Sequence, residues 1–91
     1  MQREEAVLEI KTYPNPVNAG SLLVIERSIG SYAGSINFSL ISLNGNRVSS
    51  GNYDRFPQQI MVDTNGLLPG VYLLKITSEQ GKSVSKRIII R

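Results

Sequence analysis

The 91-residue sequence contains no cysteine and no histidine. Without cysteine, the chain has no disulfide, no thiolate metal ligand and no cysteine nucleophile. Without histidine, it has no imidazole metal site and no histidine-based acid–base catalysis. The groups left for chemistry are carboxylates, lysines, hydroxyls and the backbone. The composition therefore argues against an enzyme, and we expect neither a metal nor another cofactor.

Long hydrophobic runs are also missing, because no apolar stretch exceeds four residues. A helix that spans a bilayer needs about 20 apolar residues, so no transmembrane segment is expected. Residues 1–10 contain three glutamates and lack the apolar core of a signal peptide. A secreted domain that forms the C-terminal part of a longer chain would look the same, because its signal would lie elsewhere.

The formal net charge is +3, and it is spread unevenly. The last ten residues hold four basic side chains and no acid, whereas the other 81 hold six basic and seven acidic side chains, a net of −1. Nucleic-acid-binding domains usually carry a basic surface over the whole domain, so no nucleic-acid partner is expected. The four basic residues are Lys82, Lys86, Arg87 and Arg91, and they are interleaved with Val84, Ile88, Ile89 and Ile90.

Short apolar runs alternate with turn residues along the whole chain, and no helical period is sustained. One domain of about seven strands, with turn signals about every 8–12 residues, is typical of an immunoglobulin-like sandwich. We therefore predict an all-β fold, a seven-stranded immunoglobulin-like antiparallel β-sandwich. The strands are expected at residues 6–12, 21–27, 35–43, 47–50, 58–63, 70–77 and 82–90, with a polar loop at 51–57.

Two of these strands carry a distinctive pattern. The four apolar residues at positions 22–25 predict a strand buried on most of both faces. In the last strand, Val84, Ile88, Ile90 and the stem of Lys86 share one face, and Arg87 and Ile89 share the other. An ordinary closing strand, with basic residues that discourage edge pairing, explains the same pattern.

Turn chemistry supports the sandwich. Asn44-Gly45 is a strong hairpin signal, because both residues tolerate positive φ. Pro69 and Gly70 form a corner before a strand in which the Tyr72 hydroxyl is placed to bond an upstream carbonyl, as in a tyrosine corner. These residues report the fold.

Catalytic and metal-binding interpretations are weak. Ser83 and Ser85 lie on the opposite side of a strand from Lys82 and Lys86, so serine–lysine catalysis is not expected. Asp63 opens a segment with a faint likeness to a calcium loop, but the closing glutamate is missing and a capped turn is expected.

Four motifs, in this order, carry a family resemblance. They are Tyr13-Pro14-Asn15-Pro16, residues 41–48 with Gly45, residues 68–76 with Pro69, Gly70 and Tyr72, and residues 82–91. With them, the sequence resembles a C-terminal sorting domain of the type IX secretion system of Bacteroidetes. The resemblance implies that residues 11–91 are this domain, and that residues 1–10 end an upstream linker and begin the first strand.

The resemblance also implies a function. Such domains follow a secreted cargo, fold in the periplasm, and direct the cargo through the outer membrane by way of a shuttle protein and the translocon. A sortase-like cysteine peptidase at the cell surface then removes the domain, and the cargo is anchored at the surface or released. The terminal strand is the part most associated with recognition, through strand addition or capture of the chain end. The residues expected to be read are Lys82, Lys86, Arg87, Ile88, Ile89, Ile90 and Arg91.

Two other function classes stay open at this point. A carbohydrate-binding or adhesive accessory module of a secreted enzyme would use a stacking platform of aromatic side chains. The candidates are Tyr13, Tyr32, Tyr53 and Phe56. A passive spacer domain would have no partner.

Overall fold

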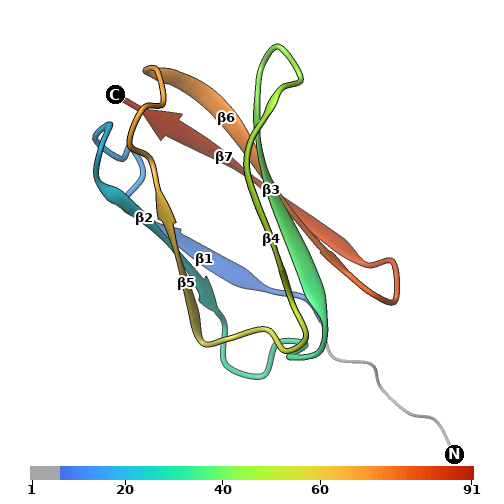
Figure 1. The fold of residues 1–91 in the computed structure, drawn as a ribbon. Coiled ribbons are helices and arrows are strands. Elements are labelled where there is room, and N and C mark those ends of the chain that lie inside the picture. Colours follow the sequence, from blue (N-terminus) through green and yellow to red (C-terminus); the bar gives the residue numbers. More distant parts are fainter. Residues whose placement is uncertain (1–6) are drawn as a thin grey trace, which may run out of the picture.

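The computed structural model describes residues 7–91, which form seven strands in two antiparallel sheets (Figure 1). The smaller sheet has the order β1-β2-β5 and contains β1 (Ile10–Tyr13), β2 (Leu22–Arg27) and β5 (Gln59–Asp63). The larger sheet has the order β4-β3-β6-β7 and contains β4 (Arg47–Tyr53), β3 (Ile36–Ser42), β6 (Gly70–Ser78) and β7 (Ser83–Ile90). The predicted all-β sandwich is confirmed, and β7 forms one edge of the larger sheet.

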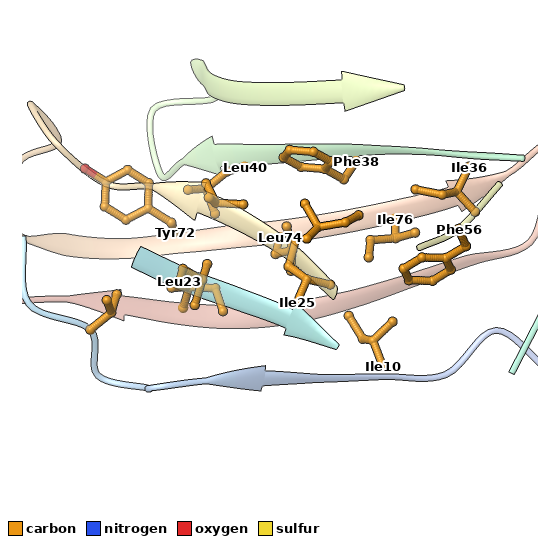
Figure 2. Packing of buried hydrophobic residues seen from close by; sticks show 14 of the residues in the cluster. Ile10, Leu23, Ile25, Ile36, Phe38, Leu40, Phe56, Tyr72, Leu74 and Ile76 are labelled. Atoms are coloured by element: carbon orange, nitrogen blue, oxygen red, sulfur yellow. The ribbon is translucent and has the colours of Figure 1, made fainter. Parts of the chain in front are cut away.

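The core lies between the two sheets, where alternate residues of each strand point inward (Figure 2). Leu23 and Ile25 of β2 face Leu40, Leu74 and Ile76 of β3 and β6, and all five side chains are fully buried. Burying one such side chain contributes about 1.5–3 kcal/mol. The apolar side chains at these inward positions therefore stabilise the packing of the two sheets against each other.

The first predicted strand, residues 6–12, is shorter in the structure. β1 begins at Ile10, and residue 6 lies outside the described residues. Residues 7–9 bond to the loop after β2 instead of to a strand. The Tyr32 N–H donates to the Val7 carbonyl at 2.9 Å, and the Ser28 N–H donates to the Glu9 carbonyl at 3.0 Å. A loop partner thus replaces the expected strand partner.

The fourth strand is longer than predicted, because β4 continues to Tyr53 through part of the expected loop. Gly51 lies opposite Phe38, and a Cβ on Gly51 would approach the Phe38 ring to 2.7 Å. The glycine therefore serves a close approach within the sheet and not a turn. The Phe38 and Tyr53 rings then stack with centroids 6.4 Å apart.

The prediction that residues 22–25 are buried on most of both faces is wrong. Leu23 and Ile25 are fully buried, but Leu22 is 49% exposed and Val24 is half-buried. The smaller sheet has only one face in the core, so its strands alternate even where the sequence is continuously apolar.

Candidate functional site

The terminal strand β7 divides its side chains between two faces, as predicted. Ile88 and Ile90 point into the core and are fully buried, and Val84 packs against the core. Arg87 and Ile89 point outward and are exposed. Ile88 and Ile90 are therefore inaccessible to a partner while the domain is folded.

The four basic residues of the terminal segment do not form one cluster. Lys86 pairs with the buried Leu74, so its side chain starts on the inner side of the sheet at the open edge. Arg87 lies on the outer face, opposite Leu73. The Arg91 Nε donates to the Asn18 Oδ1 at 3.1 Å. Lys82 is half-buried and precedes β7. A partner would meet these charges from different directions.

Residues 15–19, which we call the edge segment, cover the outer edge of β7 at its C-terminal end. The Val17 N–H donates to the Ile89 carbonyl at 2.8 Å, and the Arg91 N–H donates to the Val17 carbonyl at 3.0 Å. The Ala19 N–H donates to the Arg91 carbonyl at 2.9 Å. Val17 itself is fully buried and forms a parallel bridge with Ile90. The last residues of β7 therefore have hydrogen-bond partners on both sides.

Asn15 extends this pairing with its side chain. Its Nδ2 donates to the Arg87 carbonyl at 2.9 Å, and its Oδ1 accepts the Ile89 N–H at 3.0 Å. The amide thus bonds the strand edge as a peptide unit would. Pro14 and Pro16 flank it, and both preceding peptide bonds are cis. The Tyr-Pro-Asn-Pro motif and the terminal strand, more than 70 residues apart, form one structural unit, which sequence reasoning missed.

Toward its N-terminal end, the edge of β7 is open. Alternation along the strand directs the N–H and C=O groups of Ser83 and Ser85 to the same side as those of Ile89. Within residues 7–91, no hydrogen bond reaches these groups from that side. The open half of the edge contains Ser83 and Ser85, and the covered half contains Ile89 and Ile90 together with Arg87 and Arg91.

The predicted corner before β6 is confirmed. The Tyr72 hydroxyl donates to the Leu68 carbonyl at 2.6 Å, across a turn made by Pro69 and Gly70, whose φ is +157°. The Asn44-Gly45 hairpin is confirmed as well, because Gly45 has a φ of +87° and donates its N–H to the Ser42 carbonyl at 2.9 Å. These motif residues shape the end of the larger sheet at which β7 finishes.

The aromatic platform expected for a carbohydrate-binding module is not formed. Phe56 is buried in the core, and Tyr53 packs partly against it. The Tyr32 hydroxyl donates to the Ser35 carbonyl at 3.0 Å. Only Tyr13 of the four is an exposed aromatic side chain. The four rings therefore do not form one exposed platform.

Tyr13 belongs instead to a polar cluster on the outer face of the smaller sheet. Its hydroxyl donates to the Glu26 Oε1 at 2.9 Å and accepts the Gln59 Nε2 at 3.1 Å. The hydrogen bond from Tyr13, followed by that from Gln59, lowers the pKa of Glu26. The same bond to Glu26 raises the pKa of Tyr13. The cluster joins β1, β2 and β5 through side-chain hydrogen bonds.

Asp63 caps a turn, as expected, because its Oδ1 accepts the Asn65 N–H at 2.8 Å. In the part of the chain that the structure describes, no three histidine, cysteine, aspartate or glutamate side chains gather where they could hold a metal ion. Residues 7–91 also contain no helix long and apolar enough to cross a membrane.

Known proteins resemble the chain in sequence family and in fold. The family model described as a secretion system C-terminal sorting domain matches residues 11–91. No curated protein matches the sequence significantly. A DUF3244 family protein from Bacteroides vulgatus ATCC 8482, with an immunoglobulin-like β-sandwich fold, superposes with a TM-score of 0.67 at 15% identity, over 90% of this chain and 94% of that chain. CopC from Methylosinus trichosporium OB3b superposes with a TM-score of 0.52 at 18% identity, over 90% and 91%. At these identities the two structures show the fold alone, which is the predicted immunoglobulin-like sandwich.

Proposed function

Because residues 11–91 match its model, the chain belongs to the family of type IX secretion system C-terminal sorting domains, and we propose that it carries an attached cargo protein across the outer membrane. In this proposal the cargo precedes the domain. The domain folds in the periplasm, an outer-membrane shuttle protein receives it, and the translocon exports it with its cargo to the cell surface or the medium. The domain acts as a signal and catalyses nothing itself.

The observation that carries this proposal is the family match over almost the whole chain. The geometry of β7 supports it, because the outer face of this strand exposes Arg87 and Ile89 to solvent. Of the seven residues expected to be read, the folded domain offers a partner the exposed Arg87, Ile89, Lys86 and Arg91. Ile88 and Ile90 contribute by holding the strand in place. Recognition then uses the exposed side chains of β7, and the buried ones make that surface rigid.

A reporter fusion tests the proposal. A reporter enzyme with a periplasmic signal peptide is placed before the domain and expressed in a Bacteroidetes strain with a type IX system. We expect the reporter on the cell surface or in the medium, as measured by protease access to intact cells and by fractionation. In a strain that lacks the shuttle protein, we expect it in the periplasm. The matched control replaces the domain with another immunoglobulin-like domain.

Two results would overturn the proposal. One is a reporter that stays in the periplasm of the type IX strain. The other is equal export with and without the shuttle protein, since the route would then be a different one.

Removal of the domain by a sortase-like cysteine peptidase is tested on the same fusion. The exported reporter should have lost about 10 kDa, the mass of the 91 residues, as measured by mass spectrometry. In a strain whose peptidase has its active-site cysteine replaced by alanine, the reporter should keep the domain. Export of uncleaved reporter in both strains would contradict the processing step and leave the sorting step intact.

A further inference from the structure

The outer face of the larger sheet has an apolar hollow at the end where β7 finishes. Ile41 of β3, Leu73 of β6 and Arg87 of β7 lie side by side in register, and Val71 and Ile89 form the next row. Leu43 follows β3 at the rim. We call this hollow, of about 340 Å³, the outer groove. Its lining includes Ile41, Leu43, Val71, Leu73 and Arg87, and Ile89 lies beside Val71 in the sheet.

Several apolar side chains at the outer groove are exposed to solvent. Leu43 is 79% exposed, Leu73 is 42% exposed and Ile89 is 36% exposed. Leu68, at 77%, lines an adjoining depression that shares Leu43 and Val71 with the groove. Single exposed apolar residues are common on protein surfaces, whereas large contiguous groups of them are typical of interaction sites.

The rest of the same outer face is polar. The next row in register consists of Ser39, Lys75 and Ser85, and the one after it consists of Asn37, Thr77 and Ser83. The apolar surface is therefore confined to the end of the sheet where the edge segment already occupies the backbone of β7. A partner strand added to the open edge, at Ser83 and Ser85, would find only polar neighbours. A partner that gains apolar burial must instead contact the face.

The positive charge of the outer groove indicates that its partner carries a carboxylate. Among the described residues that line the groove and its adjoining depression, Arg87 is the one charged side chain. A guanidinium beside apolar side chains pairs well with a carboxylate when both lose water. A second copy of this chain, docked face to face, would bring a second Arg87 and no acid. The charge therefore favours a different protein.

We propose that the outer groove is the docking site for an apolar, acid-bearing segment of the outer-membrane protein that receives this domain. The apolar side chains of that segment fill the groove beside Leu73 and Leu43, and its carboxylate pairs with Arg87. This inference rests on the proposed sorting function, and it replaces strand addition with contact through the outer face of the sheet.

Direct binding to the purified, detergent-solubilised shuttle protein tests the groove. Affinity is measured by biolayer interferometry for the wild-type domain, for Leu73→Ser and for Arg87→Glu. We expect each variant to bind at least about tenfold more weakly. The matched control is Leu22→Ser, because Leu22 is also about half exposed but lies on the smaller sheet, and its affinity should stay within about twofold. Thermal unfolding of all variants confirms that the fold is kept.

Four outcomes overturn the groove proposal. The first is that both groove variants bind the shuttle protein with wild-type affinity. The second is that the Leu22→Ser control loses as much affinity as the groove variants. Sedimentation that shows a dimer of the wild type but a monomer of Leu73→Ser would make a second copy the occupant. Flotation with vesicles of phosphatidylethanolamine and phosphatidylglycerol that is lost in Leu73→Ser would make a lipid surface the occupant.

The reporter fusion separates the two proposals. Export of the wild-type fusion, together with equal export of the Leu73→Ser and Arg87→Glu fusions, overturns the groove and leaves the sorting function standing. If the wild-type fusion is not exported, the sorting function itself fails. If the wild-type fusion is exported but the two variant fusions stay in the periplasm, both proposals are supported.

Discussion

On its inner face, β7 presents Ile88 and Ile90 to the core, whereas its outer face presents Arg87 and Ile89 to solvent. The alternation of a strand thus places a packing role and a surface role on neighbouring residues. Deleting the last four residues would remove both roles at once, together with the partners of the edge segment. Truncation therefore cannot distinguish a lost signal from a lost fold. Single substitutions on each face can.

The largest expected effect separates the two faces directly. Ile88→Ala leaves a cavity in the core and should reduce the free energy of unfolding by about 2–5 kcal/mol. Ile89→Ala, one residue along the same strand, should cost less than about 1 kcal/mol. Chemical denaturation of the two variants measures the difference. Equal losses would contradict the division of β7 into a packing face and a surface face.

A substitution at Tyr72 tests how much the corner before β6 contributes to stability. Tyr72 lies opposite Ile88 in the sheet, and its hydroxyl bonds the Leu68 carbonyl. Tyr72→Phe removes that bond and should lower the free energy of unfolding by about 1 kcal/mol. Tyr53→Phe is the matched control, because within residues 7–91 the Tyr53 hydroxyl has no hydrogen bond. A control that loses as much as Tyr72→Phe would mean that the corner bond adds nothing.

Asn15 tests the edge, which lies between the two faces. Asn15→Ala removes both side-chain bonds to β7 and should cost about 0.5–1 kcal/mol, because both bonds are exposed. Amide hydrogen exchange at Ile89 should accelerate. Asn15→Asp keeps an acceptor for the Ile89 N–H. The Ile89 amide should therefore exchange more slowly in Asn15→Asp than in Asn15→Ala. If exchange at Ile89 is unchanged in both variants, the amide does not hold the edge.

The smallest effect concerns the polar cluster of Tyr13, Glu26 and Gln59 on the outer face of the smaller sheet. Tyr13→Phe removes the main cause of the lowered pKa of Glu26, so that pKa should rise toward its ordinary value, as measured by NMR titration. A carboxyl group whose pKa is lowered in the folded state stabilises the fold at pH values above its unfolded pKa. This stabilisation is lost as the pH falls through the folded pKa. The wild type should therefore lose slightly more stability on acidification than Tyr13→Phe. A Glu26 pKa that does not move would contradict this account.

The local features of this fold could be predicted from the sequence because they depend on neighbouring residues. The Asn44-Gly45 hairpin, the Tyr72 corner and the two faces of β7 all follow from spacing within a few positions. Leu22 shows the limit of this reasoning. Its exposure depends on which sheet has a free face, and no local run of residues contains that information.

The covered edge of β7 and the outer groove were less predictable because they are assembled from distant segments. The bonds of Asn15 to β7 join residues 72 and 74 positions apart. The outer groove combines the end of β3, the start of β6 and the middle of β7. Phe56 is another example, because it comes from a polar loop and yet fills the core, with its N–H bonded to the Gly34 carbonyl at 2.9 Å. Only the topology of the sheets brings these residues together.

The edge segment also has a mechanical consequence. The edge segment and β7 run parallel where Val17 pairs with Ile90. Force applied to the chain before β1 and to Arg91 would therefore slide the two segments past each other in opposite directions. The hydrogen bonds between the two segments lie perpendicular to that direction, so they would be loaded together and would not break one after another. Tension applied to the chain on both sides of the domain would therefore load these hydrogen bonds together.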